Sequence, residues 1–192
     1  MAEQQAMHAG EAVAEALRAE GVERIYSVPG SHIHPIYDGI SRIKPMQFVT
    51  CKMEPNCSLM ADAYGRLTGK PGVCLVTAGL AGQSPVGVGH QSARVERIED
   101  IPEVMAKAFH IARSGRPGPV HVELPRETDE SEYILQKEKV VLPAYRRIPT
   151  VVHQPQATDV ARFAQQLKNA KSPVIAAGKG VIRQGALGEL IA

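Results

Sequence analysis

Short apolar runs alternate with longer amphipathic stretches in the first part of the chain, and this alternation limits the possible folds more than any other feature. Four runs have the length and composition of strands buried in a sheet. They are residues 25–28, 46–50, 72–77 and 119–124. Four stretches between them repeat apolar residues at helical spacing. They are residues 10–20, 35–42, 55–68 and 102–113. Strands that alternate with helices predict an α/β fold, in which a parallel sheet carries helices on both faces.

The stretch 55–68 also predicts how its helix packs. Leu59, Met60, Ala63 and Leu67 share one side of this helix. The apolar stripe of a surface helix normally faces the core. We therefore expect that side to lie against the sheet.

Residues 78–91 have a composition that does not favour a helix. Five residues interrupt it, namely Gly79, Gly82, Pro85, Gly87 and Gly89. Parallel neighbours need a crossover of about a dozen residues or more, and it is usually helical. We therefore expect either a sheet that is short of strands or a functional loop. Gly87-Val88-Gly89 begins like a dinucleotide fingerprint, but no third Gly follows at the required spacing, so a loop is the preferred interpretation.

The second part of the chain predicts a linker and the opening of another domain. Residues 129–156 are polar, with Pro at 143, 149 and 155, and this composition is typical of a linker after a first domain at 1–128. Thr158 is the predicted N-cap of a helix that runs to about Ala170, and a strand at 173–177 and a helical start at Ala186 follow. These elements are too few to bury a core, so we interpret 157–192 as the truncated beginning of a second α/β domain.

Charge and cysteine content exclude several classes of function. Lys and Arg number 22 against 20 Asp and Glu, without a basic stripe, which argues against nucleic acid as a partner. A small molecule or another protein fits better. The first residues do not resemble a secretion signal, and no apolar run is long enough to span a membrane. Cys51, Cys57 and Cys74 lack the spacing of a zinc site or a disulfide framework, so we expect them in or near the core and the protein in the cytoplasm.

Two further groups of residues have a functional and a structural interpretation. His32 and His34 could offer two metal ligands from an extended segment, but no third ligand lies nearby in the sequence, so we interpret them as turn or surface residues and expect no metal site. Gly178-Lys179-Gly180 follows a predicted strand, where a nucleotide could bind. We prefer a structural turn.

Four passages, taken in order, resemble one known family. They are GVERIYSVPGSHIHPIYDGI (21–40), KMEPNCSLMADAYGRLTGKPGVCLVTAG (52–79), RIEDIPEVMAKAFHIARSGRPGPVHVELP (97–125) and SPVIAAGKGVIRQGA (172–186). They are similar to the N-terminal, pyrimidine-binding domain of thiamine diphosphate-dependent enzymes of the acetolactate synthase type, and to the start of the central domain of those enzymes. The resemblance implies the thiamine diphosphate-binding fold.

The resemblance also implies a site. Glu54 matches the carboxylate that bonds the aminopyrimidine ring of the cofactor, while Pro29, Gly30, Ser31, Thr77 and Gly79 match loops that line the pocket. A carboxyl group in an apolar pocket has a raised pKa, so it can share a proton with a ring nitrogen. The alternative is that Glu54 is an acidic first-turn residue that faces the helix dipole. Met53 stands where family members often have His, and Leu80 replaces an expected Pro.

Complete members of this family are transferases or lyases that decarboxylate 2-keto acids and ligate the product to a second carbonyl compound, as in branched-chain amino acid biosynthesis. They hold the diphosphate and Mg²⁺ with a C-terminal domain whose Gly-Asp-Gly…Asn motif does not occur here. We therefore expect an internal deletion near 80–91 and a homo-oligomer or a partner chain that supplies the diphosphate-binding domain. The alternative function is a non-catalytic remnant, or interaction module, that keeps the fold without turnover.

Overall fold

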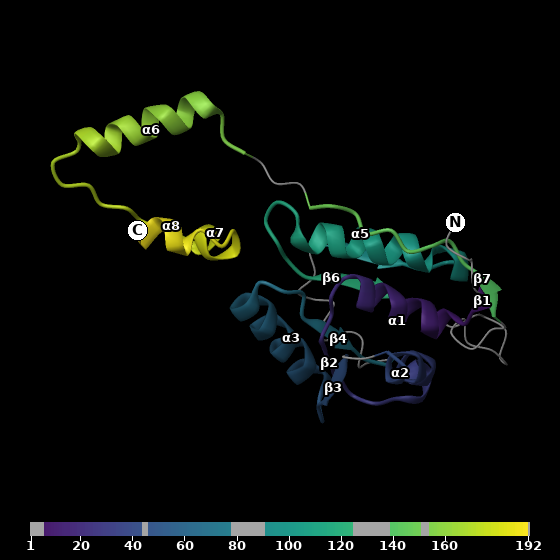
Figure 1. Ribbon diagram of the computed structural model, residues 1–192. Coiled ribbons are helices and arrows are strands. Elements are labelled where there is room, and N and C mark those ends of the chain that lie inside the picture. The colour runs from purple at the N-terminus through teal and green to yellow at the C-terminus, as the bar shows by residue number, and fades with distance from the viewer. Residues whose placement is uncertain (1–5, 44–45, 78–90, 125–138, 151–153, 192) are drawn as a thin grey trace. The chain divides into compact units, whose positions relative to one another are not determined.

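The computed structural model describes residues 6–43, 46–77, 91–124, 139–150 and 154–191. The chain divides into two compact units, Met1–Val151 and Val152–Ala192, which are described separately below (Figure 1). Among the helices in the described ranges, none has the length and apolar character needed to cross a membrane.

Parallel strands form the centre of the first unit (Figure 1). Strand β2 (Arg24–Ser27) pairs in parallel with β3 (Gln47–Thr50) on one side and with β4 (Val73–Leu75) on the other. A second parallel pair joins β5 (Gln91–Arg94) to β6 (Val120–Glu123). Strands β1 (Ala6–Met7) and β7 (Val140–Val141) form a short antiparallel ladder. The α/β class is confirmed, although the described parallel strands form two sheets rather than one.

Helices cover both faces of the sheet β3-β2-β4, as the sequence predicts. Helix α3 (Glu54–Thr68) packs on the face that carries Tyr26 and Cys74. The opposite face carries Ile25, in the larger core that also contains residues of α1 (Ala9–Ala19), α2 (His34–Ser41) and α5 (Ile101–Arg113). Two short 3₁₀ turns, Ser31–Ile33 and Ile98–Asp100, lead into α2 and α5.

The prediction about the inner side of α3 is wrong. Leu59 and Leu67 are 67% and 85% exposed, and the buried residues of this helix are Cys57 and Ala61. The physical reason is the close approach of α3 to the beginning of β4. A Cβ atom on Gly72 would lie 1.9 Å from the carbonyl oxygen of Ala61, so only small side chains fit between the helix and the strand.

Buried charge joins three distant segments of the first unit. The carboxylate of Glu20, whose side chain is 1% exposed, lies at the end of α1 and pairs with Arg113 at the end of α5. The hydroxyl of Tyr145 donates a hydrogen bond to the same carboxylate, and Arg147 lies 3.4 Å from it. Burial, and then the neighbouring carboxylate of Glu20, raise the pKa of Tyr145. The segment after β7 is therefore bound to the body of this unit.

The second unit contains helices α6 (Ala157–Asn169), α7 (Lys179–Arg183) and α8 (Leu187–Ile191). Helix α6 begins at Ala157 with Gln156 as its N-cap, so the predicted cap at Thr158 is two residues late. The predicted strand at 173–177 is also wrong, because these residues have no regular structure. A strand needs a neighbour to pair with, and the described residues of this unit provide none. Neither α6 nor α8 buries a side chain.

Candidate functional site

Three chain segments meet where the strands of the sheet β3-β2-β4 end. Residues 28–31 follow β2, residues 51–54 follow β3, and residues 76–77 follow β4. Because the three strands are parallel and adjacent, their carboxyl ends lie at one edge. In open α/β sheets, ligands bind outside this edge. The sequence places the predicted site residues Pro29, Gly30, Ser31, Glu54 and Thr77 in these segments, while Gly79 lies outside the described residues.

The turn after β2 is in direct contact with the segment after β4. A Cβ atom on Gly30 would lie 2.6 Å from the Cβ atom of Thr77, far inside normal contact distance. The backbone of Gly30 is extended, with φ −160°, so its angles do not demand glycine. The lack of a side chain is what lets the two segments touch.

A buried pair of hydroxyl groups holds the same edge from the other face. Ser27, which is fully buried, donates a hydrogen bond of 2.6 Å to the carbonyl oxygen of Leu75 and accepts one of 2.7 Å from Tyr37. The ring of Tyr37 stacks on Phe48, with 4.0 Å between the ring centroids. Sequence analysis missed both residues. The signal that could have revealed them is a polar residue, Ser27, at the end of an otherwise apolar strand.

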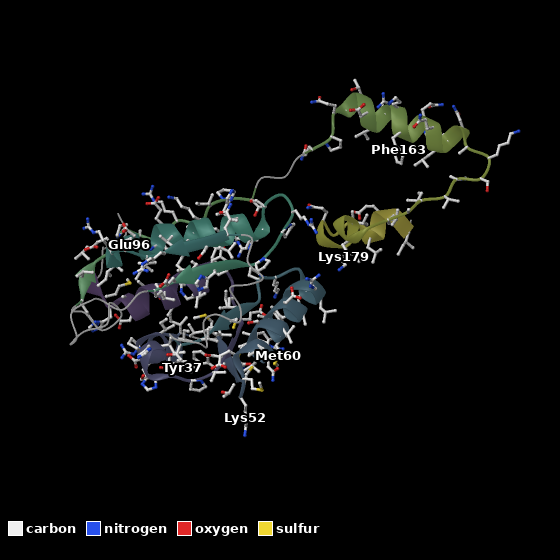
Figure 2. All side chains as sticks on the ribbon, turned by 180° about the vertical axis from the view of Figure 1, so that it is seen from behind. Tyr37, Lys52, Met60, Glu96, Phe163 and Lys179 are labelled. Carbon is white, nitrogen blue, oxygen red and sulfur yellow. The ribbon has the colours of Figure 1, made fainter. Side chains whose placement is uncertain are left out.

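Glu54 is the first residue of α3 and is partly buried. Met53 precedes it in an extended conformation and is 58% exposed. The first turn of a helix favours a carboxylate, because unpaired backbone N–H groups point towards it. On the protein side, Glu54 interacts with the thiol of Cys74: burial raises the pKa of Cys74, and the charge of Glu54 adds to that increase. Lys52, by contrast, extends away from the domain (Figure 2).

The three cysteines belong to one small cluster beneath Glu54. Cys51 and Cys57 are buried, Cys74 is half-buried, and all three are free thiols. Their predicted position in or near the core is confirmed. Burial raises the pKa of Cys57, and contacts with Cys51 and Cys74 raise it further.

The histidines singled out in the sequence lie beside this edge. His34 is exposed at the start of α2, and His32 is half-buried in the turn before it. Within the described ranges, no group of three or more His, Cys, Asp or Glu side chains has an arrangement that could hold a metal ion. The chemistry available at the edge is therefore that of a carboxylate, a backbone turn and a hydroxyl group.

Residues 7–98 match the profile of the family described as thiamine pyrophosphate enzyme, N-terminal TPP binding domain, where thiamine pyrophosphate is another name for thiamine diphosphate. Residues 7–98 belong to this family. The matched segment contains the whole sheet edge described above, including Gly30, Glu54 and Thr77.

Several curated proteins are similar to the chain over nearly all of its length. A probable acetolactate synthase large subunit of Methanocaldococcus jannaschii is 31% identical over 96% of this chain and 38% of its own length. The acetolactate synthase large subunit of Corynebacterium glutamicum is 27% identical over 96% of this chain and 35% of its own length. The acetolactate synthase isozyme 2 large subunit of Escherichia coli is 29% identical over 91% of this chain and 38% of its own length.

Two lengths in these comparisons bear on the organisation of the chain. The chain spans less than two fifths of the length of each of these three relatives. The first alignment runs over 229 residues, whereas this chain has only 192. That relative therefore has residues between the matched segments that this chain lacks.

Proposed function

We propose that this protein binds the aminopyrimidine ring of thiamine diphosphate at the carboxyl edge of the sheet β3-β2-β4, with Glu54 as the carboxylate that bonds a ring nitrogen. The observation that carries the proposal is the position of Glu54. It opens α3 at the edge where Gly30 touches Thr77, and it lies inside the segment that matches the family profile.

The residues present at this edge suit such a ring. The backbone of Gly30 packs directly against the side chain of Thr77, so residues 29–31 and Thr77 form one continuous surface at the edge. Glu54 can accept a hydrogen bond from a ring nitrogen or, when protonated, donate one. Gly79 completes the set that we propose as the pocket. When bound, thiamine diphosphate supplies a thiazolium carbon that adds to a carbonyl carbon. The part of this chain is to orient the pyrimidine ring and to hold a proton at Glu54.

We assign a 2-keto acid as the substrate class, because the similar proteins are named acetolactate synthases. The reaction class is decarboxylation and carboligation. The diphosphate and its Mg²⁺ are held by another domain, which a partner chain supplies. Free thiols fit a reducing cytoplasm as the compartment in which the protein works.

We assign the outer side of α3 to a second copy of this chain, which is distinct from the partner chain that supplies the diphosphate-binding domain. Leu59, Met60 and Leu67 are exposed on this helix, and Met53, which directly precedes Glu54, is also exposed. Isolated apolar residues on a surface are ordinary, but a contiguous stripe on one helix is typical of an interface. A partner on this stripe lies beside the proposed pocket.

We also propose that the residues missing relative to longer relatives fall between Gly79 and Ser92. The glycines of this segment and the excess length of the alignment support this position. The same proposal divides the chain into a pyrimidine-binding domain at 1–128, a linker at 129–156 and the start of a central domain at 157–192.

A second candidate function is that of a non-catalytic interaction module. The observation that favours it is the exposed stripe on α3. Such a module would keep its contacts with a partner and would not need Glu54.

Calorimetric titration with thiamine diphosphate and Mg²⁺ separates the two functions. A hydrogen bond to a charged group contributes about 1.5–3 kcal/mol, so Glu54→Gln is expected to weaken binding roughly 10- to 100-fold. Glu103→Gln is the matched control, because it removes an exposed carboxylate on α5, far along the chain from the edge. Equal binding by wild type and Glu54→Gln contradicts the assigned role, and the absence of binding in all three proteins supports the interaction module.

A further inference from the structure

Helix α3 approaches strand β4 more closely than a helix normally approaches a sheet. The contact between Gly72 and the carbonyl oxygen of Ala61, which leaves no room for a Cβ atom, shows that the two backbones touch. Side chains that face each other near this contact are therefore unusually close. Two of them are thiols that the proposed function does not use.

Cys57 and Cys74 occupy equivalent positions next to the contact. Cys57 lies one turn before Ala61, about 6 Å along the helix, and Cys74 lies two residues after Gly72, about 6.6 Å along the strand. A crossover helix runs opposite to the parallel strands that it connects. The step from Ala61 back to Cys57 and the step from Gly72 forward to Cys74 therefore run in the same direction. The two thiols face each other.

Neighbouring contacts agree with this geometry. The hydroxyl of Ser58, the residue after Cys57, lies 3.7 Å from the sulfur of Cys74. Cys57 and Cys74 also pack in one small cluster, and each thiol affects the pKa of the other. A disulfide requires Cα atoms about 4.4–6.8 Å apart, which a helix in backbone contact with a strand can satisfy.

The third thiol is less well placed to react with Cys74. Strand β2 lies between β3, which precedes Cys51, and β4. Two strand spacings are about 9.6 Å, which is beyond the range of a disulfide. The sulfur of Cys51 instead lies 3.7 Å from the sulfur of Met60. Cys51 also contacts Cys57, so the pair Cys51–Cys57 is the competing outcome of the experiment below.

We propose that Cys57 and Cys74 form a reversible thiol pair that hydrogen peroxide oxidises to a disulfide. Cys74, the half-buried thiol, reacts first: its thiolate attacks one peroxide oxygen and becomes a sulfenic acid, and the other oxygen leaves as hydroxide, which takes up the released proton to form water. The sulfur of Cys57 then attacks the sulfur of Cys74, and the sulfenic oxygen leaves as a second water molecule. Two thiols are oxidised and one peroxide is reduced.

The disulfide would fix the first turn of α3, which begins with Glu54, onto the middle of β4. Oxidation would thereby alter the position of Glu54 relative to Thr77. The formation of the thiol pair itself does not depend on the proposed function, since it requires no cofactor.

Peptide mapping after peroxide treatment tests the pair directly. Trypsin cleaves after Lys52 and Arg66, so it separates the three cysteines into three peptides. We expect the native chain to yield one linked pair, Cys57 with Cys74, and one alkylatable thiol, Cys51. The same chain oxidised in guanidinium chloride should give all three pairings. A dominant Cys51–Cys57 link, a link between chains or three free thiols overturns the proposal.

Variants and pH provide two further readouts. Cys51→Ala should still form the link, whereas Cys57→Ala and Cys74→Ala should not. Because the pKa of Cys74 is raised, little thiolate is present at pH 7. The oxidation rate should therefore increase from pH 7 to pH 9, up to about tenfold per pH unit. A rate that does not change with pH would contradict attack by the Cys74 thiolate.

Discussion

Glycine is required at position 30 because there is no room for a side chain, and not because the backbone angles demand it. Its extended φ of −160° suits any residue, but its backbone lies against the side chain of Thr77. The same contact brings together two loops that the sequence assigns to one pocket. The loss of folding stability caused by a larger residue at position 30 therefore depends on the residue at position 77. This dependence can be measured.

Gly30→Ala is expected to destabilise the protein by about 1–3 kcal/mol, because the new methyl group overlaps the Cβ atom of Thr77. Thr77→Gly removes that atom, so the double variant should recover most of this loss. Urea unfolding of the wild type, both single variants and the double variant completes the cycle. Additive effects within about 0.5 kcal/mol would contradict the contact.

The residues of the site were only partly predictable from the sequence. Glu54 and Gly30 are assigned through the family resemblance, and the apolar runs that precede them are consistent with a shared position at one edge of a parallel sheet. Ser27 carried a signal, as a polar residue at the end of an apolar strand, but its partners could not be predicted. Tyr37 lies on a separate helix, and the carbonyl oxygen of Leu75 is a backbone atom that carries no sequence signal.

Helix α3 shows what periodicity can and cannot predict for an element. The stripe of Leu59, Met60, Ala63 and Leu67 exists as predicted, but it faces away from the sheet. Spacing shows which residues share a side of a helix, and not which side meets the neighbouring strand. Here the side with Cys57 and Ala61 is buried because small residues allow the backbones to touch.

If the exposed stripe binds a second copy, charge placed on it should disperse the dimer. We expect the double variant Leu59→Lys with Leu67→Lys to sediment as a monomer at concentrations where the wild type dimerises. Both side chains are already exposed, so unfolding should change by less than about 0.5 kcal/mol.

Val160→Lys is the matched control, because Val160 is a similarly exposed apolar residue on α6. It should sediment like the wild type. A wild type that is monomeric throughout would contradict the proposed dimer. A Val160→Lys variant that is monomeric, while the α3 variant still dimerises, would place the interface elsewhere.

At the scale of the whole molecule, the two units differ in what stabilises them. The first unit has a continuous core that includes Ile25, Ile36 and Ile101. In the second unit, the helices α6 and α8 bury no side chain, and Phe163 is 58% exposed. The strand predicted at 173–177 could not be judged from its own residues, because its formation depends on a neighbour.

Hydrogen exchange should separate the two units. A helix without buried contacts is marginal in water, so amides of α6 should exchange on the order of 100-fold or more faster than those of α1 and α5. Mass spectrometry of peptides from each helix measures the difference. Equal protection of α6 and α1 in the isolated chain would contradict the absence of buried contacts on α6.

The buried carboxylate of Glu20 determines how far the first unit can be trimmed. Its Oε1 atom accepts its hydrogen bond from Tyr145, which lies 125 residues later in the sequence. A chain that stopped at Leu142 would leave this oxygen sealed from water without its donor, at a cost of about 1–3 kcal/mol. Anyone who wishes to crystallise or graft the first unit alone should therefore retain the residues through Arg147.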